Sequence, residues 1–382
     1  MIARVVHAKA KESFMAASVT HPGVYVEETF SLRLTVSSGQ TAVTAFIGDF
    51  AGLPTGGVRV NDWLDFTKLA DQGAKGEVRQ ALEPVLKGYF RNGGGHCYLV
   101  STAGSTLGEA LEAVTALGDV TILVAPGLWS QAAKSAGEWA RALTGWAADN
   151  KAMAILHTDR DHTPDQASTA VDAWDLDERV RPFAAVYYPW LQQTADTEPV
   201  VPSGAVAGAW TAVDRDRGVW KAPANIVLRG ITGPLHTATD TDQGAHLNLN
   251  FIRTFPSAGT LIWGARTRSE TDEWRYIPIR RLVSVVERDI QAALRFAAFE
   301  PNTAPTWELV RAAVDNYLHG LWRQGALQGN TLQEAYFVQV GKDITMTEND
   351  IAAGRLILKA GLATMRPGEF ITLQFTQETA QA

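Results

Sequence analysis

Five short apolar segments alternate with amphipathic segments between residues 42 and 189, and this alternation constrains the fold more than any other feature of the chain. We predict buried strands at residues 42–48, 97–101, 120–126, 152–158 and 183–189. Helices are expected near residues 107–117, 130–148 and 164–174. Strands and helices that alternate at this spacing form a sheet with parallel neighbours, covered by helices and joined by right-handed crossovers. The first half is therefore predicted to be an α/β domain with a helix-covered mixed sheet.

The second half is expected to be α+β. A polar connector, QQTADTEPVVPSG, marks a domain boundary near residue 200. Beyond it we predict amphipathic helices at residues 281–299 and 306–324, and strands at 335–340 and 369–375. Because 382 residues are many for one core, we divide the chain into residues 1–40, 41–200, 201–366 and 367–382. These are an N-terminal extension with a linker strand, an α/β domain, a second core domain, and a C-terminal strand with an arm.

The segment that follows the connector, PSGAVAGAWTAVDRDRGVWKAPAN, spans residues 202–225. Its glycines and prolines indicate a tight backbone with turns, and Trp210 and Trp220 are bulky anchors that would pack beside glycines. Residues 214–217 alternate in charge (DRDR). We favour a solvated hairpin or loop for this charged tip, with a contact to another subunit as the alternative.

Composition excludes several classes of protein. An apolar share of 46% and a charged share of 20% are those of an ordinary globular protein and exclude disorder over most of the chain. A net charge of -7 argues against a general nucleic-acid binder. The single cysteine forms no intrachain disulfide, and no apolar run is long enough for membrane insertion. Without a recognisable secretory signal, we expect the protein to be made and assembled in the cytoplasm.

Charge is unevenly distributed along the chain. Residues 1–250 carry 20 basic and 27 acidic side chains, whereas residues 251–325 carry 10 basic and 8 acidic ones. Within this locally basic region, Arg281, Arg288 and Arg295 recur every seven residues and form one stripe along the predicted helix. A solvated face and a recognition surface for an acidic protein partner are both compatible with this pattern.

Two short runs contain residue types that are common in ligand-binding sites, but the context of each favours a structural role. Three glycines at residues 93–95 precede a strand, whereas a phosphate loop joins a strand to a helix, so we expect a turn. The run HTDRDH at residues 157–162 contains metal-ligand residue types, but its position before Pro164 favours a loop with a helix cap. No GxSxG, HExxH or paired CxxC motif occurs, and although a carboxylate site would leave no such signature, nothing in the sequence supports an enzyme. We therefore predict no catalytic, cofactor-binding or metal-binding residues and no cofactor.

Both ends of the chain have the character of strands. Residues 22–36 alternate loosely between apolar and polar, and EFITLQF at residues 369–375 does so near the C-terminus. A terminal strand pairs either within its own domain or with the sheet edge of a neighbour. We regard residues 1–14 as non-native or disordered, because Met15 is itself a plausible start.

Several segments, taken in order, resemble the conserved parts of contractile tail sheath proteins of phages, R-type pyocins and extracellular contractile injection systems. They are HPGVYVEE (21–28), TAVTAFIGDF (41–50), PSGAVAGAWTAVDRDRGVWKAPAN (202–225), GARTRSETDEWRYIPIRRL (264–282), FEPNTAPTW (299–307) and PGEFITLQFTQ (367–377). The resemblance covers nearly the whole chain and is strongest between residues 200 and 310. It is weak in the α/β segment and in the first 20 residues.

The resemblance implies a non-enzymatic polymer of stacked rings around an inner tube, with a baseplate and a terminator or cap protein as further partners. The particle would be a phage tail, or a tail-like particle of the kind that is released from the cell. Residues 41–200 would be the outer domain and 201–366 the sheath core domain. Terminal strands would be exchanged between subunits through Val24, Tyr25, Val26, Phe370, Ile371 and Leu373. The arginine stripe of Arg281, Arg288 and Arg295 would face the tube. A soluble α/β enzyme or binding protein is the alternative.

Overall fold

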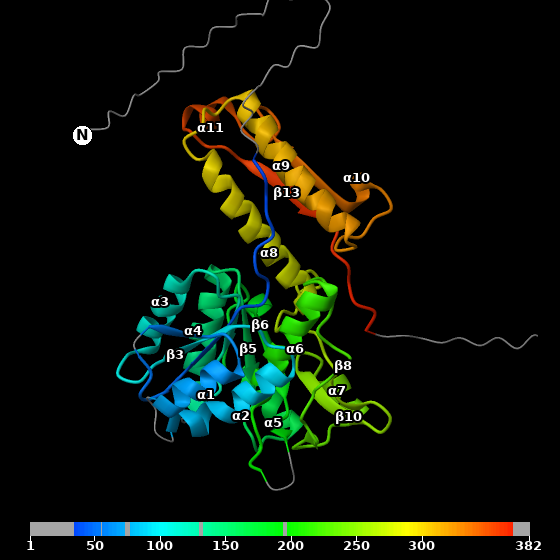
Figure 1. Ribbon diagram of the computed structural model, residues 1–382. Helices are drawn as coiled ribbons and strands as arrows, with labels where there is room; N and C mark the ends of the chain where they lie inside the picture. The colour runs from blue at the N-terminus through cyan, green and yellow to red at the C-terminus, as the bar shows by residue number, and fades with distance from the viewer. Residues whose placement is uncertain (1–33, 55, 73–76, 130–132, 194–196, 370–382) are drawn as a thin grey trace, which may run out of the picture. The chain divides into compact units, whose positions relative to one another are not determined.

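The computed structural model describes residues 34–54, 56–72, 77–129, 133–193 and 197–369. The largest element in this part of the chain is a nine-stranded sheet of order β2-β3-β1-β4-β5-β6-β10-β11-β8 (Figure 1). Its strands are β1 (Thr44–Gly48), β2 (Gly57–Val60), β3 (Cys97–Ser101), β4 (Ile122–Val124), β5 (Met153–His157), β6 (Ala184–Tyr188), β8 (Ile226–Val227), β10 (Asn250–Phe255) and β11 (Gly259–Ile262). Strands β3 to β10 are parallel neighbours, and β2, β11 and β8 are antiparallel. The predicted mixed sheet is confirmed.

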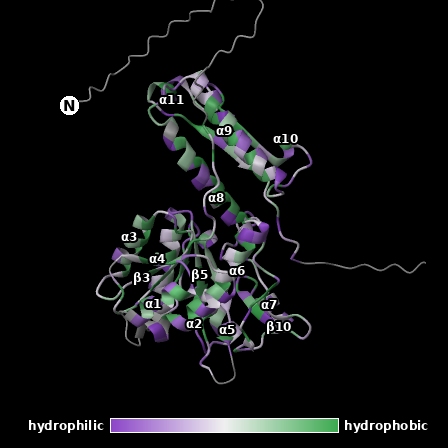
Figure 2. Ribbon diagram, viewed as in Figure 1, coloured by the Kyte–Doolittle hydropathy of each residue, from purple (hydrophilic) through white to green (hydrophobic). Residues whose placement is uncertain are grey.

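Helices cover both faces of this sheet. One hydrophobic core contains residues of α3 (Leu107–Leu117), α4 (Ala133–Asp149) and α5 (Pro164–Asp172). The other contains residues of α1 (Trp63–Gln72), α2 (Glu77–Arg91) and α6 (Pro202–Arg217). Successive residues of β1 alternate between the cores, with Ala45 and Ile47 in the first and Phe46 in the second. Central strands such as β5, buried along its length and coloured hydrophobic in Figure 2, are therefore apolar on both faces.

The segment that we predicted as a hairpin or loop is instead the helix α6, so that prediction is wrong. A Cβ atom on Gly204 would lie 2.6 Å from the carbonyl oxygen of Val85, and one on Gly208 would lie 2.1 Å from that of Tyr89. The two glycines are four residues apart and therefore share one face of the helix. Their function is to let the backbones of α6 and α2 approach closely, and Gly218, at φ 88°, follows the end of the helix.

The second half adds two long helices and a separate two-stranded sheet (Figure 1). The helices are α8 (Ile277–Leu294) and α9 (Ala304–Arg323), and the antiparallel strands are β12 (Tyr336–Val340) and β13 (Leu358–Leu362). A third hydrophobic core joins both helices to β12. Both helices and β12 were predicted, with shifted ends, whereas β13 was not.

Short elements connect these parts. They are β7 (Leu191–Gln192), β9 (Gly233–Pro234), α7 (Asp240–Ala245), α10 (Leu332–Ala335), α11 (Glu348–Ala352) and the 3₁₀ turns η1 (Arg181–Phe183) and η2 (Arg295–Ala297). The sheet continues across the boundary that we expected near residue 200, because β10, β11 and β8 extend it and α6 covers its face. Among the described helices, none is long and apolar enough to cross a membrane.

Candidate assembly site

A buried ion pair connects α8 to α6. The guanidinium of Arg281 donates to both carboxylate oxygens of Asp214, at 2.7 and 2.6 Å, and to the carbonyl oxygen of Thr41 at 3.1 Å. The two charged side chains are 4% and 2% exposed. The guanidinium carbon also lies 4.7 Å from the ring centre of Trp210. This pair fixes the start of α8 against the helix that lies on the sheet, because a buried charge is stable only when its partner stays in place.

A second ion pair holds the root of the C-terminal arm. Arg266 donates to both carboxylate oxygens of Glu369, with a shortest distance of 2.6 Å, and the hydroxyl of Tyr276 donates to Glu369 at 3.0 Å. Burial, and then the charge of Glu369, raises the pKa of Tyr276. Asn250 fixes Arg266 in turn by accepting from its backbone N–H at 2.7 Å. We call Arg266, Tyr276 and Glu369 the arm anchor.

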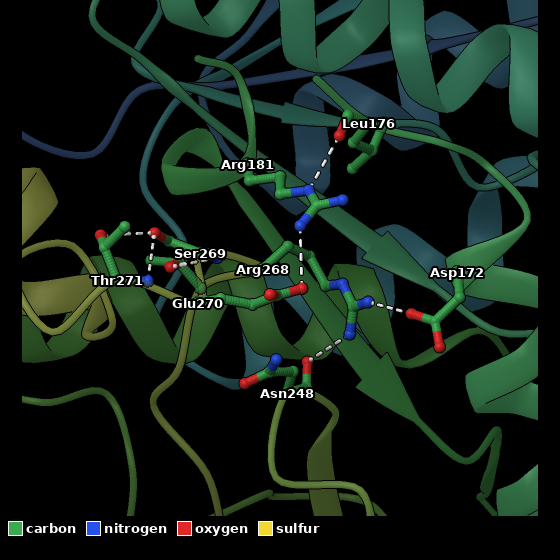
Figure 3. A network of polar contacts seen from close by, with 9 residues as sticks. Asp172, Leu176, Arg181, Asn248, Arg268, Ser269, Glu270 and Thr271 are labelled. Carbon is green, nitrogen blue, oxygen red and sulfur yellow. Dashed lines mark hydrogen bonds and ion pairs between the residues drawn. The ribbon is translucent and has the colours of Figure 1, made fainter. Parts of the chain in front are cut away.

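The next residues of the same loop bind the α/β part of the chain (Figure 3). Arg268 donates to the carboxylate of Asp172 and to the carbonyl oxygen of Asn248, and Arg181 donates to Glu270 at 2.8 Å. Burial lowers the pKa of Arg268, and the charge of Asp172 opposes that shift. Residues 265–270 (ARTRSE) thus contact two parts of the chain. Arg266 binds Glu369 of the arm anchor, whereas Arg268 and Glu270 bind Asp172 and Arg181 of the α/β part. This run positions segments of the chain rather than presenting a reactive group.

The predicted arginine stripe is divided by packing. Arg281 is buried in the pair with Asp214, which contradicts its expected position on an open, tube-facing surface. Arg288 is half-buried and Arg295 is exposed, and both line a cavity of about 400 Å³. The heptad spacing correctly placed the three side chains along one side of the helix. That side is covered at Arg281, partly covered at Arg288 and exposed at Arg295.

The predicted exchange residues Val24, Tyr25, Val26, Phe370, Ile371 and Leu373 lie outside the described residues. The chain enters the described part beside the third core, in which Val36 is buried, and it leaves at the arm anchor. Both entry and exit are therefore fixed to the folded body. Strand exchange through these residues stays a prediction.

The two runs considered as ligand sites have structural functions. Residues 93–95 form the turn between α2 and β3, as predicted, with Gly93 at φ 95°. Thr163 caps α5 through a capping box with Gln166, which confirms the predicted helix cap. His157, however, is not in the loop but buried in β5, where burial lowers its pKa to about 3. No cluster of three metal-ligating side chains occurs among the described residues.

Two features of the site were missed from the sequence. The four-residue spacing of the glycines in GAVAG is a known signal of close helix packing, and it identifies the α6–α2 contact. The arm anchor leaves only a weak signal, because Arg266 and Glu369 are far apart in the sequence. Its only signal in the sequence was Glu369, the acidic residue at the start of the strand that we predicted at residues 369–375.

Comparisons with known proteins agree with this architecture. Residues 269–378 match the family described as phage tail sheath C-terminal domain. A putative prophage major tail sheath protein of Pseudomonas aeruginosa (strain UCBPP-PA14) is 27% identical over 212 residues, which cover 54% of this chain and 53% of that protein. The matched region thus spans about half the length of that curated relative.

Several solved structures match this chain over nearly its whole length. The sheath of the extracellular contractile injection system PVC, in the contracted state, is 42% identical with a TM-score of 0.78 and is matched over 95% of this chain and 99% of its own. The contracted helical sheath of the anti-feeding prophage is 38% identical, with a TM-score of 0.76 and coverage of 95% and 100%. A chain of the contracted anti-feeding prophage baseplate is 41% identical, with a TM-score of 0.77 and coverage of 94% and 99%.

Identity of this degree over nearly the whole of both chains defines the class of protein as a structural subunit of a contractile sheath. The chain belongs to the contractile tail-sheath family. The recognition made from the sequence motifs is confirmed.

Proposed function

We propose that copies of this chain stack helically around an inner tube in an extended state and that contraction drives the tube through a target envelope. The solved relatives are a contracted helical sheath and a chain of a baseplate, which supports self-assembly and contact with a baseplate. Tube protein and a terminator or cap are the further partners of the proposal. The energy of the stroke is stored at assembly, so the role is structural and requires no cofactor. Assembly takes place in the bacterial cytoplasm.

The observation that carries the proposal is the combination of fixed arm roots with open strand edges. Strands β12 and β13 pair with each other, and neither has a second strand partner among the described residues. Phe337 on β12 is 52% exposed. A short sheet with two open edges is an acceptor for added strands. Terminal segments of neighbouring copies, with Val24–Val26 and Phe370–Leu373, would supply them.

Contacts of this kind explain how the subunits stay connected during contraction. A contact between different surfaces of identical subunits does not close and generates an open helix. Exchanged strands tether the folded bodies while these rotate and slide. The arm anchor fixes the direction in which the C-terminal segment leaves its own body. Because both terminal segments start from fixed points, Val36 and Glu369, each can reach only a limited set of positions, which favours pairing with one particular neighbouring subunit.

We expect the surface that binds the tube to lie in the locally basic region of residues 251–325 and to present exposed arginines. Since Arg281 is used within the subunit, we place the contact on two arginines of α9: Arg311, whose side chain is 43% exposed and pairs with Glu308, and Arg323, which is exposed. Exposed ion pairs of about 0.2–1 kcal/mol each suit a surface that must release the tube during contraction. Replacing both by glutamate and co-expressing the tube protein is expected to give sheaths without tubes. Normal filled particles would show that the tube binds elsewhere.

The proposed function is tested by expressing the full chain alone and imaging it in negative stain. Long hollow tubes are expected, and a discrete small species with a copurifying ligand would support the soluble α/β alternative. Deleting residues 1–28 is expected to abolish the tubes, because it removes the N-terminal exchange strand. Deleting residues 1–14 is the matched control and should leave them intact. Tubes of normal length from the longer deletion would refute strand exchange at this end.

A further inference from the structure

A cavity of about 630 Å³ lies beside the arm anchor, and we call it the arm cavity. Pro367 and Glu369, at the end of the described chain, form part of its wall. The remaining walls come from α7, from β10 and from the segments just before β8, after β11 and before α8. The root of the C-terminal arm is therefore itself a part of this cavity.

The uncharged part of the wall is mainly apolar. Its largest side chain is Trp263, which is 37% exposed and contacts Phe255 at a distance of 4.7 Å between ring centres. Leu247, Ala265 and Tyr276 add apolar surface to the wall. Cavities lined by aromatic and aliphatic side chains, with a few polar groups, are typical binding sites for apolar groups.

The charged side chains of the wall already have partners within the subunit. They are Asp240, Arg253 and Glu369. Arg253 donates to the carboxylate of Asp240 at 2.7 Å and to the side-chain oxygen of Gln243 at 3.1 Å. Glu369 is paired with Arg266 in the arm anchor. Because each of these charges is compensated inside the subunit, the cavity favours an apolar occupant over a charged one.

The chain that follows Glu369 has the chemistry of such an occupant, and it begins at the cavity. Residues 370–375 read FITLQF, so that four of the six side chains are apolar. Arg266 and Tyr276 fix the carboxylate of Glu369 by hydrogen bonds. Since consecutive Cα atoms are only about 3.8 Å apart, the side chains of Phe370 and Ile371 can reach the wall of the cavity. Continuity of the chain thus identifies the occupant as the subunit's own arm.

We propose that the unassembled subunit stores the apolar start of its own C-terminal arm, Phe370 and Ile371, in the arm cavity and releases it on assembly. The inference rests on the proposed function, in which the same side chains add to the β12–β13 sheet of a neighbouring copy. Storage and exchange exclude each other, because one side chain cannot occupy both sites. Storage also keeps an apolar strand from nonspecific pairing while the subunit is free.

The first test locates the arm in the free subunit. The photo-cross-linker p-benzoyl-phenylalanine, which keeps an apolar aromatic side chain, is placed at Phe370 of the full chain. The protein is irradiated below the concentration at which tubes form, and the products are mapped by mass spectrometry. The expected product joins position 370 to the wall of the arm cavity in the same copy, in the peptides that contain Leu247 or Trp263.

The second test blocks the cavity without changing the arm. Gly244 of α7 lines the cavity, and a Cβ atom added there meets no other atom within 4 Å. Gly244→Trp is therefore expected to fill the cavity and to remove the cross-link. It should also lower the protein concentration needed for tubes by roughly tenfold or more, because the state with a released arm is then no longer a minor one of about 10% or less. Gly244→Ala, too small to fill the cavity, is the matched control and should change neither result.

Several results would overturn the inference. They are the absence of the cross-link to the cavity wall, cross-links only between different copies, a cross-link that persists in Gly244→Trp, and a threshold for tubes that this variant leaves unchanged or raises. The cross-link is measured in the free subunit and does not depend on polymerisation. A chain that forms no tubes would therefore refute the proposed function, whereas the cross-link would still decide whether the arm is stored.

Discussion

Replacing Asp214 by asparagine tests whether the second half of the chain is held to the sheet by the buried pair with Arg281. The substitution preserves the size of the side chain and removes its charge. Arg281, at 4% exposure, then keeps a buried positive charge that donates hydrogen bonds only to one amide oxygen and to the carbonyl oxygen of Thr41. The ring of Trp210 offers a further electrostatic contact.

The expected cost follows from the burial of both partners. Breaking a buried ion pair by removing one charge typically costs about 3–5 kcal/mol of unfolding free energy. With an unfolding entropy of about 2.1 cal/mol/K per residue, a unit of roughly 350 residues loses about 1.4 °C in melting temperature per kcal/mol. We therefore expect a decrease of about 4–7 °C.

Urea titration and differential scanning calorimetry of the unassembled subunit measure this loss. Asp216→Asn, two residues along the same helix, is the matched control, because Asp216 pairs with Arg215 at the exposed surface and should change the stability by less than about 0.5 kcal/mol. The double variant Asp214→Leu/Arg281→Met should recover most of the loss. A loss below about 1 kcal/mol for Asp214→Asn would refute the reasoning.

Three further predictions concern other contacts. Gly208→Ala should lose at least about 3 kcal/mol of unfolding free energy, because its Cβ would lie 2.1 Å from the carbonyl oxygen of Tyr89, whereas Gly145→Ala, with open space around it, should gain about 0.5–1 kcal/mol. Because burial lowers the pKa of His157 to about 3 from its ordinary value of 6.5, only the unfolded chain takes up this proton between these pH values. The unfolding free energy should thus fall on acidification through this window, by up to about 1.4 kcal/mol per pH unit, and less steeply in His157→Phe; equal slopes in urea titrations would contradict this. Glu369→Gln should lower the unfolding free energy by about 1–3 kcal/mol and reduce tube formation, because it weakens the pair with Arg266. Glu348→Gln, at an exposed pair with Lys342, is the control and should leave tubes unchanged. Normal tubes from Glu369→Gln would show that the arm anchor does not direct the arm.

The strands of the sheet were predictable because a strand that is buried on both faces needs a continuous run of apolar residues, and such a run is visible in the sequence. β1 and β5 are examples, and the helices between them follow from the same alternation. Segment 202–217 was not predictable in this way. Its glycines and prolines suggested turns. The four-residue spacing of Gly204 and Gly208 does signal close helix packing, but only the position of α2 shows which helix approaches them.

Charged residues were harder to place than apolar ones. The run DRDR suggested a solvated tip because each charge had a neighbour of opposite sign, yet Asp214 is buried against Arg281, 67 positions away. Spacing likewise grouped Arg281, Arg288 and Arg295 correctly on one side of a helix but could not show what covers each. A periodic pattern defines a face of a helix, whereas the partner of that face is a property of the fold.

The most direct test of the account is a helical cryo-EM reconstruction of the polymer formed by the full chain. We expect a hollow sheath in which the segments around Val24–Val26 and Phe370–Leu373 add to the β12–β13 sheets of neighbouring copies, while each body keeps the Arg281–Asp214 pair. A polymer in which both terminal segments pair within their own subunit, or the absence of any polymer, would contradict it.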